Sequence, residues 1–126
     1  MPDKVIDASA MAALVFGEPQ AEEIADRIRG ASLHAPVLID FEVASVCLKK
    51  LRQYSKQRAA LLAGHALARQ MAVRKHSVNT QEIVLMAEQT KLSAYDATYL
   101  WLAGSLGAEL VTLDKQLARV AESLMR

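Results

Sequence analysis

Short apolar runs alternate along this chain with longer segments in which apolar residues recur at helical spacing. The clearest short run, from Lys4 to Asp7, is rich in β-branched residues and ends at an acid, which is typical of a buried strand. A second run is stopped by Pro36, and the last one precedes Asp114. From this pattern we predict strands over residues 4–7, 32–35, 76–79 and 109–113.

The longer segments predict helices between these strands. They cover residues 8–16, 18–30, 37–54, 56–75 and 115–124, a segment with Thr80 as its N-cap, and a segment with Ser93 as its N-cap that ends at Gly107. Strands that alternate with helices imply a mostly parallel sheet with helices on both faces. The predicted fold is therefore α/β, in a single domain over residues 1–126, because no linker or internal repeat is visible.

Composition fits a soluble globular protein. Of the 126 residues, 52% are hydrophobic and 23% are charged. No apolar run approaches the roughly 18 residues of a membrane span. The N-terminus carries two acids where a secretory signal needs basic and then apolar residues. Cys47 is the only cysteine, so an internal disulfide is excluded and a reducing compartment fits. We expect a cytoplasmic protein without membrane contact.

Several acids stand where predicted strands end or the next helix begins. Asp7 ends the first strand, Asp114 follows the last, and Glu42 lies early in the helix after Pro36. In an open parallel sheet the carboxyl ends of the strands meet along one edge, where ligands bind. Asp96 lies in the first turn of a helix that follows another helix, so the pattern locates it at this edge less firmly. We predict that these acids meet there.

Each acid also has a purely structural interpretation. Asp7 fits a turn after a strand, Asp96 fits the charge favoured at a helix N-terminus, and Asp114 fits an N-cap. Glu42 is harder to explain in this way, because it interrupts an apolar run in which an unpartnered carboxylate is costly. Four clustered carboxylates would repel one another unless a cation lay among them, and oxygen ligands favour Mg²⁺ or Mn²⁺. The scattered histidines give no pattern for zinc.

Positive charge gathers in the middle of the chain. The net charge is only +1, which shows no overall basic bias, yet no acid occurs between Glu42 and Glu82. This basic stretch could line a phosphate backbone, and it fits a solvated helix face equally well. The residues that we name as candidate contacts to phosphate groups are Lys49, Lys50, Arg69 and Arg74.

Four short motifs contain the four acids. They read VIDASA at residues 5–10, FEVASV at 41–46, SAYDATYLWLA at 93–103 and LVTLDKQL at 110–117. In this order they resemble the acidic motifs of PIN-domain ribonucleases, and they are most similar to the VapC-type toxins of bacterial and archaeal toxin–antitoxin pairs. The resemblance spans nearly the whole chain.

This resemblance implies a PIN-like α/β fold and an endoribonuclease that hydrolyses RNA phosphodiester bonds with Mg²⁺ or Mn²⁺. The acids that it implies as catalytic and metal-binding are Asp7, Glu42, Asp96 and Asp114. The last of these belongs to the motif that is usually the weakest in such families. Ser9 and Thr112 match hydroxyl residues beside the first and last acids, where they would hydrogen-bond carboxylates or water. Family members commonly form homodimers and are inhibited by a small cognate antitoxin protein, so we expect both partners here.

Two other classes of protein compete with this interpretation. A non-catalytic PIN-like module that binds RNA or a protein is the alternative, and the complete set of acids argues against it. A receiver-type phosphoacceptor domain also gathers aspartates at strand ends. That domain needs two adjacent acids near the first strand and a lysine after a separate last strand. Asp7 has no adjacent acid, and Lys115 directly follows Asp114.

Overall fold

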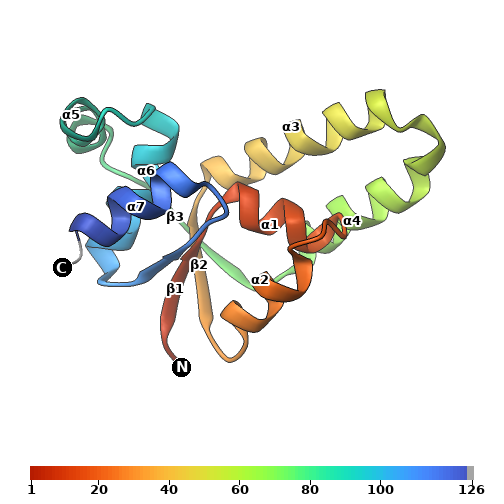
Figure 1. Ribbon diagram of the computed structural model, residues 1–126, viewed down its shortest axis with the longest axis horizontal. Coiled ribbons are helices and arrows are strands. Elements are labelled where there is room, and N and C mark those ends of the chain that lie inside the picture. The colour runs from red at the N-terminus through yellow and green to blue at the C-terminus, as the bar shows by residue number, and fades with distance from the viewer. Residues whose placement is uncertain (125–126) are drawn as a thin grey trace.

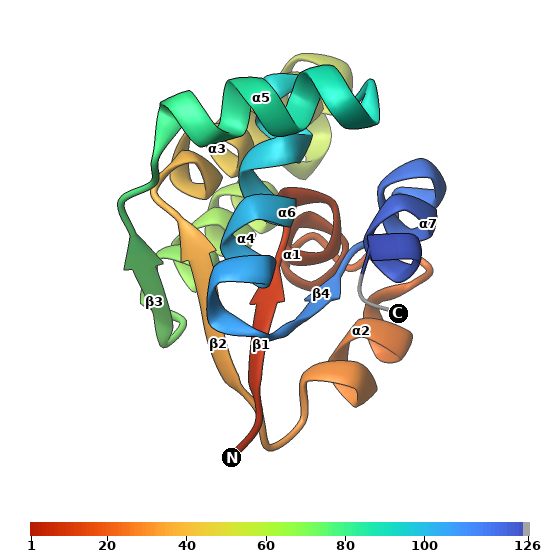
Figure 2. The same ribbon diagram turned by 90° about the vertical axis from the view of Figure 1, so that its left-hand side faces the viewer.

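Four parallel strands form the central sheet of the computed structural model, which describes residues 1–124 (Figures 1 and 2). The strands are β1 (Asp3–Ile6), β2 (Ser32–Pro36), β3 (Val73–His76) and β4 (Glu109–Val111). Their order across the sheet is β3-β2-β1-β4, and every neighbouring pair is parallel. The predicted parallel sheet is confirmed.

Helices cover both faces of this sheet, as predicted. The described residues form α1 (Ala8–Val15), α2 (Ala21–Ile28), α3 (Leu38–Gln53), α4 (Arg58–Gln70), α5 (Thr80–Thr90), α6 (Ala94–Leu106) and α7 (Lys115–Leu124). A short 3₁₀ turn, Ser55–Gln57, joins α3 to α4. Figures 1 and 2 show α6 and α7 on one face of the sheet and α1 and α2 on the other. Of these, α6 contacts β1, β2 and β4, and α5 packs on the outside of α6.

The chain changes direction across the sheet between β1 and β4. From β1 it moves through β2 to β3 at one edge, and the segment containing α5 and α6 then returns it to β4 at the other edge. In open α/β sheets ligands bind at the carboxyl ends of the strands on either side of such a switch point. The backbone N–H of Asp7 donates to the carbonyl of Val111 at 3.1 Å, so the pairing of β1 with β4 continues up to this edge.

Local signals explain why α6 begins and ends where it does. The hydroxyl of Ser93 accepts the backbone N–H of Asp96 at 3.0 Å, which caps the helix as predicted. Gly107 ends the helix with a left-handed φ of 61°, a conformation that favours glycine. Between these ends, Tyr99 and Leu102 are buried against the sheet, in one core cluster with Val5 of β1. The caps therefore fix Asp96 at the end of α6 that faces the switch point.

The α3–α4 arm, residues 38–70, extends away from the sheet (Figure 1). Its base packs against α1. Gly64 allows this approach, because a Cβ atom there would lie 2.5 Å from the carbonyl oxygen of Val15 and 2.9 Å from the ring of Phe16. The arm is thereby held close to the C-terminal end of α1.

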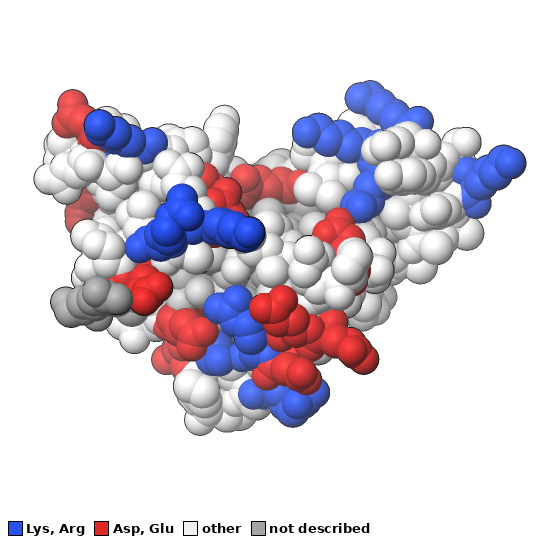
Figure 3. All heavy atoms as spheres, viewed as in Figure 1, with Lys and Arg blue, Asp and Glu red and all other residues white. Residues whose placement is uncertain are grey.

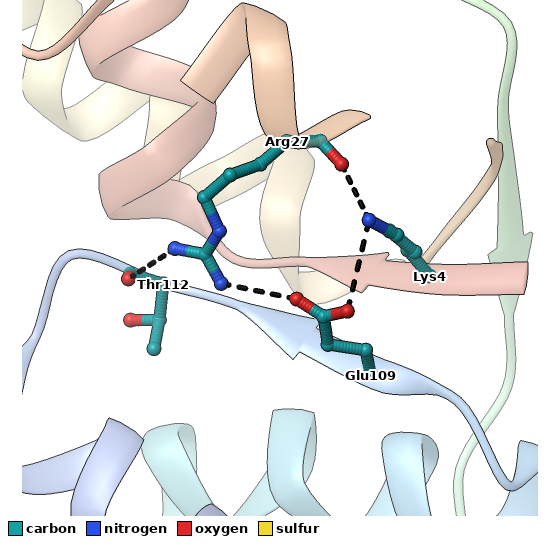
Figure 4. A network of polar contacts seen from close by, with 4 residues as sticks. All are labelled: Lys4, Arg27, Glu109 and Thr112. Atoms are coloured by element: carbon teal, nitrogen blue, oxygen red, sulfur yellow. Dashed lines mark hydrogen bonds and ion pairs between the residues drawn. The ribbon is translucent and has the colours of Figure 1, made fainter. Parts of the chain in front are cut away.

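A charged network ties α2 to the neighbouring strands (Figure 4). The guanidinium of Arg27 donates to the carbonyl oxygen of Thr112 at 3.4 Å and pairs with Glu109 at 3.3 Å. Lys4 donates to the carbonyl oxygen of Arg27 at 2.5 Å and lies 3.6 Å from Glu109. These contacts hold the end of β4 from behind, just before Asp114.

The predicted boundaries in the middle of the chain are wrong. Helix α4 ends at Gln70 instead of residue 75, and the third strand covers residues 73–76 instead of 76–79. This strand pairs only with β2, and its Arg74 and Lys75 are exposed. An edge strand of this kind has no buried apolar pattern, so its composition reads as the continuation of a basic helix.

Imidazole contacts cross the sheet beside this edge strand. Nδ1 of His34 lies 2.9 Å from Nε2 of His76, and Nε2 of His34 lies 2.9 Å from a carboxylate oxygen of Asp3. These side chains link β1, β2 and β3. Contacts between polar side chains therefore stabilise this edge of the sheet, where β3 has no apolar pattern.

Smaller differences concern helix starts and strand ends. The second helix begins at Ala21, not at residue 18, because Gly17 adopts a left-handed φ of 65° and a turn follows it. Asn79, not Thr80, caps α5 by accepting the N–H of Glu82 at 3.1 Å. The last strand ends at Val111, two residues earlier than predicted.

No described helix is both long and apolar enough to cross a membrane. The predicted single domain was given as residues 1–126, and residues 125–126 lie outside the described residues.

Candidate active site

Asp7 is held by three hydrogen-bond donors at the end of β1. Its Oδ1 accepts the backbone N–H of Ala10 at 3.0 Å and the hydroxyl of Ser9 at 2.7 Å, and its Oδ2 accepts the hydroxyl of Thr112. The residue is only 5% exposed. Burial raises the pKa of the Asp7 carboxyl, the three hydrogen bonds oppose this shift, and the charge of Asp114 adds to it. The carboxylate is therefore fixed in place and crowded by charge.

Ser9 and Thr112 join the two loops that carry Asp7 and Asp114. The hydroxyl of Thr112 accepts the backbone N–H of Asp114 at 3.0 Å while it donates to Asp7. The hydroxyl of Ser9 accepts the backbone N–H of Leu113 at 3.0 Å. Asp114 in turn caps α7, because its Oδ1 accepts the N–H of Leu117 at 2.9 Å. The structural interpretation of Asp114 as an N-cap thus holds, and its other carboxylate oxygen has no hydrogen-bond donor among the described residues.

Glu42 lies one turn into α3 and meets α6. The hydroxyl of Tyr99 donates to its Oε1 at 2.6 Å. Burial raises the pKa of the Glu42 carboxyl, this hydrogen bond opposes the shift, and the charges of Asp7 and Asp96 add to it. Tyr99 shows the complementary effect, since burial and the adjacent Glu42 raise the pKa of its hydroxyl. Glu42 therefore has a hydrogen-bonding partner inside its apolar surroundings.

Asp96 joins this group from the first turn of α6. Burial raises the pKa of its carboxyl, and the charges of Asp114 and Asp7 raise it further. The structure thus brings each of the four predicted acids into electrostatic range of at least two others, including Asp96, whose position the sequence pattern located least firmly. They come from four separate elements at the switch point between β1 and β4.

The chemistry of these side chains fits a hard divalent cation. They offer only carboxylate oxygens, and burial together with the charges of neighbouring acids raises the pKa of three of them. Within residues 1–124, no three His, Cys, Asp or Glu side chains form a ready set of ligands around one point. A cation at this edge would therefore be held by carboxylate oxygens of this group together with water, as is usual for Mg²⁺ in proteins.

The four predicted phosphate contacts lie apart from the acids. Lys50 pairs with Glu18 at 3.0 Å, and Arg74 projects from the edge strand β3. Lys49 is exposed on α3, and Arg69 lines a hollow between α1, α3 and α4. No described contact joins any of them to an acid of the site. Figure 3 shows acidic atoms in the hollow between the α5–α7 side and the α3–α4 arm, with basic side chains on both sides of it.

Sequence reasoning missed residues that support the site. Tyr99 fits the pattern of an apolar helix as a packing residue, yet its hydroxyl contacts Glu42. Its spacing of three residues from Asp96 was an available signal, because positions three apart share a helix face. Lys115 and Arg119 are exposed on α7 next to Asp114 and have no ion-pair partner among the described residues. Their spacing of four residues, which places both on one face of the helix, was a further available signal.

Comparisons with known proteins establish the family. Residues 4–123 match the family model described as the PIN domain. A VapC ribonuclease of Mycobacterium bovis is 36% identical over 121 residues, which cover 94% of this chain and 91% of that protein. This chain belongs to the PIN-domain family and its VapC group. Another VapC relative, Ribonuclease VapC3 of Pyrobaculum aerophilum, is 31% identical over 126 residues and covers 96% of each chain.

Solved structures share the PIN-domain fold. A crystal structure of a Pyrobaculum aerophilum protein matches with a TM-score of 0.75 at 23% identity, covering 98% of this chain and 93% of that one. The crystal structure of Mycobacterium tuberculosis VapC20, a toxin that cleaves the sarcin-ricin loop, matches with a TM-score of 0.66 at 16% identity. It covers 93% of this chain and 94% of that one. The predicted family and fold class are confirmed.

Proposed function

We propose that this VapC-group protein is a cytoplasmic endoribonuclease that requires Mg²⁺ or Mn²⁺, and that it is the toxin of a type II toxin–antitoxin pair. The proposed catalytic and metal-binding residues are Asp7, Glu42, Asp96 and Asp114, within a single domain of residues 1–126. One observation carries the proposal. Carboxylates from four elements share one edge of the sheet, where burial and the charges of neighbouring acids raise the pKa of three of them. Such an arrangement costs stability unless a cation or a substrate uses it.

The protein's own residues would orient the reacting groups. Ser9 and Thr112 hold both oxygens of Asp7 in one orientation. Because α7 holds one oxygen of Asp114, the other is directed away from that hydrogen bond. When bound, the cation would lower the pKa of a water molecule and neutralise charge on the scissile phosphate. A carboxylate of the group would accept the proton that this water loses. No described side chain is needed as a nucleophile.

The substrate is proposed to be RNA, bound along the hollow of Figure 3. Basic side chains of the α3–α4 arm, of β3 and of α7 would contact the phosphate backbone. The proposed contacts are Lys49, Lys50, Arg69 and Arg74, together with Lys115 and Arg119 of α7. Arg69 and Arg119 carry no ion pair among the described residues, so they are available to a phosphate group. Lys50 would have to exchange its contact with Glu18.

Protein partners are proposed on two grounds. The chain belongs to the VapC group, whose resemblance implies a small cognate antitoxin and a homodimer. Large apolar side chains are also exposed near the site: Phe41, next to Glu42, is 71% exposed, and Tyr95, next to Asp96, is 62% exposed. Exposed apolar surface of this kind is typical of an interface.

A cleavage assay with a substituted acid tests the proposed function. Purified protein is incubated with a pool of structured RNA, with Mg²⁺ or Mn²⁺ or with a chelator, beside the Asp96→Asn variant. We expect metal-dependent cleavage by the wild type and a loss of at least about 100-fold in the variant, because one of the cation's oxygen ligands becomes neutral. Cleavage that survives both the chelator and the substitution would contradict the proposal. Binding of RNA or a protein without cleavage would favour a non-catalytic module.

A further inference from the structure

Tyr99 combines complete burial with a polar contact at the candidate site. It is 2% exposed and is among the largest fully buried side chains, and its ring belongs to the main apolar core. Its hydroxyl nevertheless reaches across from α6 to Oε1 of Glu42 on α3, at 2.6 Å. Phenylalanine would fill the same core volume, so packing alone does not account for the hydroxyl.

The contact constrains a side chain that is otherwise free to turn. Glu42 has three rotatable side-chain bonds, and the hydroxyl of Tyr99 is its only hydrogen-bond partner among the described residues. The ring of Tyr99 is locked by its core neighbours, so it presents the hydroxyl in one direction. With Oε1 engaged, Oε2 is the oxygen that remains free for a ligand.

The other acids are held by different means. Asp7 and Asp114 accept backbone N–H groups next to their own loops, at Ala10 and Leu117. Glu42 accepts no backbone donor, and its partner lies 57 residues away in sequence. Tyr99 thus orients the Glu42 carboxylate, as backbone N–H groups orient the carboxylates of the two aspartates.

From this geometry we propose that Tyr99 is a positioning residue for the metal site. It fixes Glu42 through Oε1, so that Oε2 would be the oxygen available to a cation bound among the neighbouring acids. This role rests on the proposed function, since it assumes that Glu42 contributes to binding of the cation.

The test compares two variants that each remove one hydroxyl from the same helix. Tyr99→Phe keeps the buried ring and removes the contact. The matched control is Tyr95→Phe, because Tyr95 is exposed and has no hydrogen-bond partner among the described residues. Binding of Mn²⁺ to each protein is titrated by electron paramagnetic resonance of the free ion, and RNA cleavage is measured as a function of Mn²⁺ concentration. Thermal unfolding checks that each variant is folded.

We expect Tyr99→Phe to weaken Mn²⁺ binding by about 10-fold, as is typical when a group that orients a metal ligand is lost. Its cleavage rate at saturating Mn²⁺ should return to within about twofold of the wild type, because the substitution affects binding of the ion and not the chemical step. Tyr95→Phe should match the wild type in Mn²⁺ binding. A merely structural role for Tyr99 would lower the rate at every Mn²⁺ concentration.

A second pair of variants keeps the test decisive if Tyr99→Phe is poorly stable. In a Glu42→Gln background, adding Tyr99→Phe should change Mn²⁺ binding by less than about twofold, because the two residues act as a unit. A full 10-fold effect in that background would overturn the proposal. Equal Mn²⁺ binding by the wild type and Tyr99→Phe would overturn it as well, and would leave the proposed function intact. No Mn²⁺ binding by the wild type would overturn both.

Discussion

Asp7 accepts hydrogen bonds from three donors, more than each of the other three acids, although burial works against its charge. Thr112 matters most among these donors, because the same hydroxyl also receives the backbone N–H of Asp114. It is itself buried, and its backbone carbonyl is held from behind by Arg27 (Figure 4). One hydroxyl thus sets the relative position of the first and last acids.

The hydroxyl of Thr112 should contribute more to the free energy of unfolding than its methyl group does. Thr112→Val keeps the shape of the side chain and leaves a buried carboxylate and a backbone N–H without this partner, so we expect a loss of about 1.5–3 kcal/mol in the free energy of unfolding. Thr112→Ser keeps the hydroxyl and should cost less than about 1 kcal/mol. Urea unfolding of the three proteins measures both. A valine variant as stable as the serine variant would show that the hydroxyl does not hold Asp7.

The identity of the acids could be predicted from sequence, while their support could be predicted only in part. Asp7 and Asp114 follow apolar strands, and Glu42 interrupts an apolar run, so each is visible as an exception to a local pattern. The contact between Tyr99 and Glu42 joins residues 57 positions apart. Tyr99 also satisfies the helix pattern as a core residue, and its place on the helix face of Asp96 does not reveal which acid its hydroxyl contacts. That second role depends on how α3 and α6 meet in three dimensions.

Among the elements, the strands with buried apolar residues were predictable, and the bounds of the basic edge strand β3 were not. β1 and β4 each contain two adjacent buried apolar residues, Val5 with Ile6 and Leu110 with Val111, and that pattern is visible in the sequence. β3 has the exposed Arg74 and Lys75 at its centre and is supported by contacts of His76, which follow no apolar periodicity. The same basic residues made α4 look five residues longer than it is.

Close packing of α4 on α1 gives a prediction about the arm. Gly64→Ala places a methyl group 2.5 Å from the carbonyl oxygen of Val15, which is backbone and cannot move alone. We expect a net loss of about 1–3 kcal/mol, since overpacking outweighs the gain in helix propensity. The matched control is Gly104→Ala in α6, where a Cβ meets no atom within 4 Å, and it should gain about 0.5–1 kcal/mol. Thermal or urea unfolding compares them, and a stabilising Gly64→Ala would refute this packing.

Over the whole molecule, positive and negative charges lie in separate regions, although the net charge is only +1. With the four acids of the site set aside, ten acidic residues face fifteen Lys and Arg, an excess of five positive charges. Much of this excess lies on the α3–α4 arm and on α7, on either side of the acidic hollow (Figure 3). A cation bound in the hollow would offset its negative charge and leave a surface suited to a polyanion. This distribution depends on the folded arrangement, because the sequence shows only that the basic residues are clustered.

The central claim is that these four acids together bind a divalent cation, and crystals of the wild-type protein soaked in Mn²⁺ test it most directly. Anomalous scattering locates the ion without reference to activity or to RNA. We predict a Mn²⁺ peak at the switch point between β1 and β4, with carboxylate oxygens from among Asp7, Glu42, Asp96 and Asp114 as its protein ligands. If no Mn²⁺ is found at this edge of the sheet at a saturating concentration, or if Mn²⁺ binds only at other residues, the claim that these acids bind the cation is contradicted.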